Sequence, residues 1–239
     1  MCILVTLVSP LTRRDCVRSA RLVLGAALAA GVLSTAALPA AAAQAAIPAP
    51  VSAGPAGLPV PPGRATVTIK GQAQQTGYYC APAAGSILLR AFGISRSQAR
   101  LAKEMRTDAE AGATKRPNTL AVLNAYVGPK GYGFRLTYAK DDPAALMYRV
   151  SQAVGVHKRP TIVAVLGNKL PWSKGERDVG HAIVAYGYDR SKGTIAVWDP
   201  NGRRGATGKH VISAKALAAV VHDLPADGLG GVFDLYRTL

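Results

Sequence analysis

Hydrophobic and polar positions follow a helical spacing in the first part of the chain and a strand-like spacing in the last part. Apolar residues recur at helical spacing in four segments, 81–92, 97–105, 118–127 and 142–154. Pro82 and Pro143 stand near the starts of two of these segments, where proline fits the first turn of a helix. The pattern therefore predicts four helices, interrupted by one short alternating strand at 134–139.

The last third of the chain contains short runs of β-branched residues that are typical of strands. Strands are predicted at 161–166, 181–188, 194–199 and 231–236, with a further helix at 212–222. The turn sequence DRSKG joins the second and third strands into a hairpin, with Tyr188 and Gly193 expected to flank the turn. Helices followed by an antiparallel sheet indicate an α+β fold in which the N-terminal helices pack on the sheet.

The first 43 residues have the composition of an export signal. Arginines precede the apolar run 22–38, and small residues follow at 39–46, which is the order found in secretory signal peptides. Cleavage is expected near Ala43 to Ala46. An uncleaved membrane anchor is the alternative, because the run falls only slightly short of the roughly 20 apolar residues that span a bilayer. The Ala and Gly content of the run and the small residues after it favour cleavage. The sequence therefore predicts a signal peptide at 1–43 and a secreted protein without a stable membrane span.

Residues 44–63 form a second segment of unusual composition. They are rich in Pro, Ala and Gly, a composition that buries too little apolar surface to fold and favours an extended linker. The remaining residues, 64–239, are enough for one hydrophobic core and are predicted to form a single domain.

Basic residues outnumber acidic residues, with 29 Lys and Arg against 13 Asp and Glu. The predicted signal peptide carries four Arg and one Asp, so the rest of the chain keeps a net charge of +13. Such a charge favours polyanionic partners, which for an exported protein are anionic polymers of the cell envelope. A solvated basic face is the alternative. The basic residues are not interleaved with aromatic residues as in nucleic-acid-binding modules, so no nucleic-acid partner is predicted.

Cys80 is the only cysteine outside the predicted signal peptide, because Cys2 and Cys16 both lie within it. It therefore has no partner for an intramolecular disulfide, and a single thiol is too few for a cysteine-rich zinc site. Cys80 also precedes the predicted helix 81–92, and the N-terminus of a helix favours a thiolate. A buried structural cysteine is the other interpretation. No spacing in the sequence suggests a metal or an organic cofactor.

A nucleophilic thiol needs a base, and the base needs a group that orients its ring. His181 opens one strand of the predicted hairpin, and Asp199 closes the other strand just before Pro200. The expected turn places these two residues almost opposite each other, although a slip of one residue would reverse one face. The alternative for His181 is a histidine that merely occupies the end of a strand. The alternative for Asp199 is an ordinary residue that begins a turn.

Acyl transfer also needs donors for the oxyanion that forms on the attacked carbonyl group. The backbone N–H of Cys80 is one candidate. A side-chain amide upstream could supply the other, and Gln72, Gln74 and Gln75 all lie within reach along the chain.

Three segments together resemble the C39-like cysteine peptidase family, whose fold is papain-like. These segments are QQTGYYCAPAAGSILLRAFG, GHAIVAYGYD and IAVWDP, and the resemblance extends from about Ile69 to Ile212. By the family pattern, Gln74 would be the oxyanion residue, Cys80 the nucleophile, His181 the base and Asp199 the residue that orients it. The family usually has Gly between Cys and Pro, where this chain has Ala81.

The resemblance implies a cysteine peptidase that hydrolyses amide bonds of a peptide or protein substrate. Family members fused to ABC transporters cut leader peptides inside the cell, a role that the predicted export signal disfavours. One alternative is a non-catalytic protein that binds envelope polyanions through its charge. Another is an amidase or acyltransferase that acts on cell-wall peptides, because the same residues serve each of these reactions.

Overall fold

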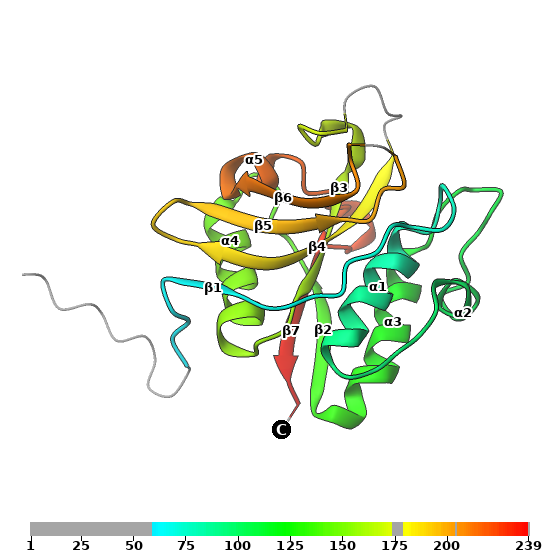
Figure 1. Cartoon of the computed structure of the whole chain (residues 1–239), viewed down its shortest axis with the longest axis horizontal. Coiled ribbons are helices and arrows are strands. Elements are labelled where there is room, and N and C mark those ends of the chain that lie inside the picture. Colours follow the sequence, from blue (N-terminus) through cyan, green and yellow to red (C-terminus); the bar gives the residue numbers. More distant parts are fainter. Residues whose placement is uncertain (1–58, 174–178, 204, 239) are drawn as a thin grey trace, which may run out of the picture. The chain divides into compact units, whose positions relative to one another are not determined.

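Two apolar cores lie on opposite faces of one antiparallel sheet (Figure 1). This computed structural model describes residues 59–173, 179–203 and 205–238. The predicted signal peptide 1–43 and most of the predicted linker 44–63 lie outside these ranges. No helix in the described ranges has the length and apolar character needed to cross a membrane.

The sheet has seven strands in the order β2-β7-β3-β4-β5-β6, with the short β1 paired to β4. All the pairs are antiparallel. The strands are β1 (Arg64–Thr66), β2 (Tyr132–Thr137), β3 (Thr161–Leu166), β4 (Gly180–Asp189), β5 (Thr194–Asp199), β6 (Gly208–Ser213) and β7 (Val232–Arg237).

The first core lies between the sheet and three N-terminal helices, which Figure 1 shows grouped together. These helices are α1 (Cys80–Ala91), α2 (Gln98–Glu104) and α3 (Arg116–Val127). The side chains of Leu88, Leu101 and Leu123 are fully buried in this core. The α+β class, with N-terminal helices packed on an antiparallel sheet, is therefore confirmed.

The second core covers the other face of the sheet with α4 (Pro143–Ser151) and α5 (Ala214–Ala219). Neighbouring strand residues point to different cores, as the alternation of a strand requires: Ile162 belongs to the first core and Val163 to the second. Strands covered on both faces contain almost continuous apolar runs, which explains why β3 and β4 carry so few polar residues.

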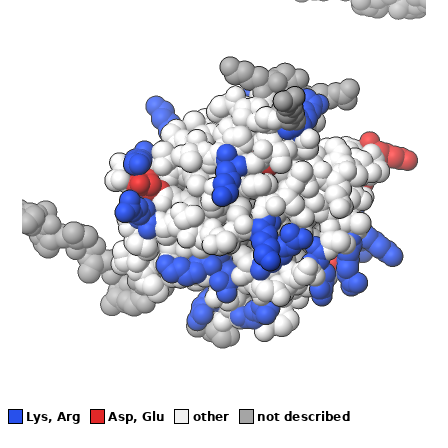
Figure 2. Space-filling view, viewed as in Figure 1, with Lys and Arg blue, Asp and Glu red and all other residues white. Residues whose placement is uncertain are grey.

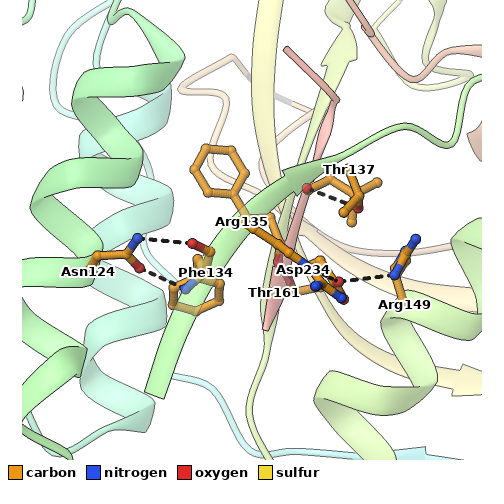
Figure 3. Close-up of polar contacts among 9 residues, drawn as sticks. Asn124, Phe134, Arg135, Thr137, Arg149, Thr161 and Asp234 are labelled. Atoms are coloured by element: carbon orange, nitrogen blue, oxygen red, sulfur yellow. Dashed lines mark hydrogen bonds and ion pairs between the residues drawn. The ribbon is translucent and has the colours of Figure 1, made fainter. Parts of the chain in front are cut away.

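The edge strand β2 is attached to α3 through one side chain. Asn124 Nδ2 donates to the carbonyl of Phe134 at 2.9 Å, and the amide of Phe134 donates to Asn124 Oδ1 at 2.7 Å (Figure 3). Because β2 pairs only with β7, this amide side chain satisfies backbone groups that an edge strand leaves unpaired.

Two predictions about the elements were wrong. The helix expected at 212–222 covers only Ala214–Ala219, because Ile212 and Ser213 end strand β6, which the sequence analysis did not predict. The side chain of Ser213 instead caps the helix by accepting from the amide of Ala216. The hairpin turn has the expected length but lies one residue later in the chain: Asp189 and Thr194 pair with each other and flank it.

The hairpin contains an irregularity that decides which side chains share a face. Gly187 pairs with Ala196, but Ala185 pairs with Val197, so Tyr186 is an extra residue on β4. Such a bulge shifts the register by one residue and reverses the alternation beyond it. Without the bulge, His181 and Asp199 would lie on opposite faces, whereas with it they lie on the same face.

Candidate active site

Cys80 is the first residue of α1. A helix start was predicted here because Pro82 fits the first turn of a helix. Tyr79 at the N-cap makes no side-chain hydrogen bond to the helix, so the first amides of α1 are free of the usual cap and favour a negative charge on the thiol. The thiol is partly exposed and lines a cavity of about 730 Å³ together with Gln74 and His181. Three of the predicted site residues therefore meet at one cavity.

His181 connects this cavity to Asp199. Its Nε2 atom lies 2.7 Å from Asp199 Oδ1, and its ring interacts with the Cys80 thiol. Asp199 is fully buried, while the His181 side chain keeps only a small exposed fraction. The structure thus brings Cys80, His181 and Asp199 into one continuous chain of contacts.

The contacts shift the pKa values of all three groups towards their charged forms. Burial raises the pKa of the Cys80 thiol, but the hydrogen bond and the charge of His181 outweigh burial and lower that pKa overall. Burial lowers the pKa of His181, while Asp199 and Cys80 outweigh it and raise that pKa to about 10. Burial opposes the charge of Asp199 as well, yet its hydrogen bond to His181 leaves the carboxyl pKa lowered. A thiolate–imidazolium pair is the state that these shifts favour.

Asp199 also accepts hydrogen bonds from two further donors. The backbone amide of Asn201 donates to Oδ1 at 2.8 Å, and the indole Nε1–H of Trp172 donates to Oδ2 at 2.8 Å. The Trp172 ring in turn stacks on His210, with ring centroids 3.9 Å apart. The carboxylate is therefore held in one orientation from three directions.

Trp172 and His210 are site residues that the sequence analysis did not assign to this role. Trp172 is an aromatic residue in a charged loop of the sequence, and His210, one of the four histidines, has no acidic residue near it in the sequence that would suggest a partner. Nothing in their spacing relates them to Asp199, because the loop before β4 and the unpredicted strand β6 bring them together.

The segment before Cys80 is fixed along its length against β5 and α2. Gly71 lies flat on Trp198, where a Cβ atom would come within 2.5 Å of the indole ring, and Trp198 Nε1–H donates to the carbonyl of Gln72 at 3.1 Å. The amide of Gln74 donates to the carbonyl of Pro200 at 2.6 Å. The position of Gln74 beside the cavity therefore depends on its own backbone hydrogen bond and on the contacts that Gly71 and Gln72 make with Trp198.

The buried side chain of Gln98 adds a second attachment from α2. Its Oε1 accepts from the amide of Gln75 at 2.9 Å, and its Nε2 donates to the carbonyl of Ala73 at 2.8 Å. One amide side chain thus holds the backbone on both sides of Gln74, and its role could not be read from the sequence.

Of the three candidate glutamines, Gln74 and Gln75 line the cavity and Gln72 does not. Gln75 is exposed, whereas Gln74 is half-buried and its Oε1 atom has no hydrogen-bond partner among the described residues. Gln74 is therefore the less exposed of the two glutamines at the cavity.

A search of the curated proteins found no match. The chain is similar to the solved peptidase domain of Streptococcus ComA, a bifunctional ABC transporter involved in quorum sensing, with 17% identity over 70% of this chain and 97% of that one, and a TM-score of 0.46.

Two further solved structures have comparable similarity. A double-glycine-motif protease from an AMS/PCAT transporter, in complex with its leader peptide, has 13% identity over 73% of this chain and 95% of that one, with a TM-score of 0.48. A protein described as a C39-like peptidase from Bacillus anthracis has 14% identity over 65% of this chain and 91% of that one, with a TM-score of 0.44.

The sequence itself matches a family model, that of the Peptidase_C39-like family, over residues 66–222. The match covers well over half of the chain and includes the segment before Cys80, the helix that Cys80 begins, and both strands of the hairpin. The chain therefore belongs to the family of C39-like peptidases, the family that its three motifs resemble.

Proposed function

We propose that the protein is a secreted cysteine peptidase that hydrolyses peptide bonds with Cys80 as nucleophile, His181 as base and acid, and Asp199 as the residue that orients His181. The observation that carries this proposal is the chain of contacts from the Cys80 thiol through His181 to the buried Asp199 carboxylate. A buried histidine and carboxylate beside a thiol at a helix N-terminus supply what nucleophilic catalysis by cysteine requires.

The reaction would begin with attack of the Cys80 thiolate on the carbonyl carbon of the scissile bond. The imidazolium of His181 then gives its proton to the leaving nitrogen, so that the amine departs and a thioester remains on Cys80. Water attacks the thioester while His181 accepts a proton, which releases the carboxylic acid and restores the thiol. Asp199 binds the other ring nitrogen throughout and keeps the ring directed at the sulfur.

The negative oxygen that forms in each attack would be stabilised by the Cys80 backbone amide and the Gln74 side chain. Both lie at the same cavity, and the backbone of Gln74 is fixed by Pro200. Removal of one oxyanion donor lowers kcat by about 10² to 10³. We therefore expect Gln74→Ala to reduce kcat by about that factor, while Gln75→Ala, a matched change of the exposed neighbour, leaves kcat nearly unchanged.

The first test is the rate of alkylation of Cys80 by iodoacetamide as a function of pH, read at Cys80 by peptide mass spectrometry. The wild-type thiol should react well below the free-thiol pKa of about 8.5. The variant His181→Ala should lose this reactivity, and the control His157→Ala, a histidine away from the cavity, should retain it. Equal profiles in all three proteins would contradict the proposed pair.

Product analysis separates peptide hydrolysis from the related activities. The protein and its Cys80→Ala variant would be incubated with a mixture of unmodified peptides and with cell-wall peptides. New carboxyl ends on the unmodified peptides, formed only by the wild type, indicate a peptidase. Cleavage of cell-wall peptides alone indicates an amidase of the envelope, and transfer of the acyl group to an added amine indicates an acyltransferase.

A further inference from the structure

A second cavity of about 980 Å³ lies apart from the Cys80 site and shares no lining residue with it. Its walls come from the end of β7, the edge strand β2, and the segment Gln152–Val156, which continues α4 as a π-helix. Pro59, Val60 and Pro62 line it as well, so the chain before β1 reaches this cavity. Several distant parts of the sequence thus converge on one hollow.

Most of the charged side chains in this cavity are basic. Five of them line it from different elements: Arg135, Arg149, Lys158, Arg159 and Arg237. The lining contains one carboxylate, Asp234. On the face displayed in Figure 2, Lys and Arg clearly outnumber Asp and Glu, and several lie along the lower edge, the side on which β7 ends in Figure 1.

The single carboxylate neutralises only part of this charge. Asp234 Oδ2 binds Arg135 Nε at 2.9 Å and Arg149 Nη1 at 3.0 Å (Figure 3). Asp234 is buried, and its one negative charge is shared by two guanidinium groups. Arg159, Lys158 and Arg237 form no ion pair with any described residue, and the cavity keeps an excess of positive charge.

Two of these arginines also keep donors that the protein does not use. The Nε–H groups of Arg149 and Arg159 are buried and have no acceptor among the described residues. Buried donors without a partner are rare in folded proteins. The positive field acts on His157 too, whose pKa is lowered first by burial and then by the charge of Arg237.

Aromatic rings fix the guanidinium groups in place. The Arg159 group lies 5.1 Å from the centre of the Phe92 ring and 6.0 Å from that of Tyr132, and the Arg237 group lies 5.4 Å from that of Tyr132. Guanidinium groups held over rings lose less freedom when they bind an anion. The cations are therefore preorganised to an extent that freely solvated surface charges are not.

The backbone at the cavity is also unusual. Lys158 has a φ of 55°, in the left-handed region that a lysine seldom adopts, and its Nζ donates to the carbonyl of Gly155 at 2.5 Å. It follows directly after the π-helix and His157. Left-handed residues of this kind and π-helical turns are both found preferentially where proteins bind ligands.

We propose that this cavity binds an inorganic polyphosphate, a linear polyanion with closely spaced phosphate groups. Five cations from several elements exceed what one phosphate ion can contact, which favours a ligand with several charges. The concave shape favours a flexible chain over the flat surface of a membrane. The site is independent of the proposed peptidase activity, because the two cavities have no residue in common.

The test measures binding of short-chain polyphosphate to the purified protein by isothermal titration calorimetry. The variant Arg135→Gln/Arg237→Gln removes two exposed charges of the cavity, and Lys209→Gln/Lys215→Gln removes two exposed charges elsewhere. Because a hydrogen bond to a charged group contributes substantially to affinity, the first variant should bind at least about tenfold more weakly, and the control within about twofold of wild type. Thermal melting of both variants verifies that they remain folded.

Three outcomes would overturn the proposal. Equal weakening in both double variants would mean that binding follows the total charge of the protein. Equal affinity for orthophosphate would mean that a single anion fills the site, and stronger binding to vesicles of anionic lipid than to polyphosphate would replace the polymer with a membrane. The variant Cys80→Ala should bind polyphosphate as the wild type does, whether or not the peptidase activity is found.

Discussion

At the scale of single residues, Asp199 is the group on which the candidate site depends most. One oxygen accepts from His181 and from the amide of Asn201, and the other accepts from Trp172. Every one of these contacts requires an acceptor. An amide side chain in the same place could satisfy only one side, because its nitrogen is a donor.

This geometry predicts the effect of Asp199→Asn on stability. With its oxygen towards His181 and Asn201, the new amide nitrogen would face the indole N–H of Trp172, and two buried donors would oppose each other. We expect a loss of about 1–3 kcal/mol in the free energy of unfolding, measured by urea denaturation.

The second variant, Asp199→Asn/Trp172→Phe, removes the opposing donor and tests that cause. Its free energy of unfolding should exceed the value expected from adding the two single losses by about 1 kcal/mol or more. Strict additivity of the two substitutions would show that the opposed donors are not the source of the loss.

The pair Cys80 and His181 also predicts how stability changes in alkaline solution. Above a pH of about 8.5 the thiol of the unfolded chain loses its proton, and the unfolded histidine, with a pKa of about 6.5, is already neutral. The folded pair keeps one proton on His181 up to a pH of about 10. Because the folded state then holds more protons, the free energy of unfolding should fall by about 1 kcal/mol over this interval.

Urea denaturation at closely spaced pH values measures this fall. The variant Cys80→Ala/His181→Gln lacks both titrating groups and should show a flatter dependence between pH 9 and 10. The same slope in both proteins would mean that the pair does not hold the proton in the folded state.

The sequence predicted the residues of this site better than their surroundings. Cys80, His181 and Asp199 could be proposed because a helix start, a strand start and a strand end are local signals. Trp172 and Gln98 could not, because a donor to a buried carboxylate and an amide that clamps a backbone acquire their roles only in the folded chain. The catalytic roles themselves stay predictions until the variants above are measured.

At the scale of elements, the hairpin shows why register escaped prediction. The expected flanking pair, Tyr188 and Gly193, was wrong by one position on each strand, and the bulge at Tyr186 was not foreseen. The bulge brings His181 and Asp199 to the same face of the hairpin. Strand periodicity predicts the alternation of side chains within β4, but an extra residue depends on packing across the sheet. Strand β6 was missed because a helix begins immediately after it.

The flat contact between Gly71 and Trp198 predicts a further effect at this scale. A methyl group on Gly71 would overlap the indole ring, so Gly71→Ala should displace the segment that leads to Gln74. We expect a loss of about 1–3 kcal/mol in the free energy of unfolding, together with a lower kcat for peptide cleavage.

The matched control is Gly63→Ala, because a Cβ atom at Gly63 meets no other atom within 4 Å. This variant should leave the free energy of unfolding and kcat nearly unchanged. Normal activity of Gly71→Ala, despite its lower stability, would separate the position of Gln74 from this contact.

At the scale of the whole molecule, the sequence predicted the layers on one face of the sheet and not on the other. The order of helices and strands indicated the α+β class, and the first core confirms it. The second core, in which α4 and α5 cover the opposite face, was not predicted, because helical periodicity does not say which face of a sheet a helix will cover. The arginine-rich cavity beside α4 was hidden for the same reason.

The predicted export signal also predicts where the mature protein begins. Protein collected outside the producing cell should begin between Ala43 and Ala46, because the small residues that a signal peptidase requires lie there. N-terminal sequencing or intact mass measures this directly. A chain that retains residues 22–38 and sediments with membranes would instead indicate an uncleaved anchor.

The order of the site residues along the chain has a consequence for when the protein becomes reactive. Cys80 lies on α1, whereas His181, which it contacts, lies on β4, and Asp199, which contacts His181, lies on β5, far towards the C-terminus. A chain that leaves the ribosome or crosses a membrane N-terminus first therefore exposes an ordinary thiol, because the hairpin has not yet followed. The proposed chemistry would be acquired only when synthesis is nearly finished, so the order of the elements itself would delay that chemistry in the cell that makes the protein.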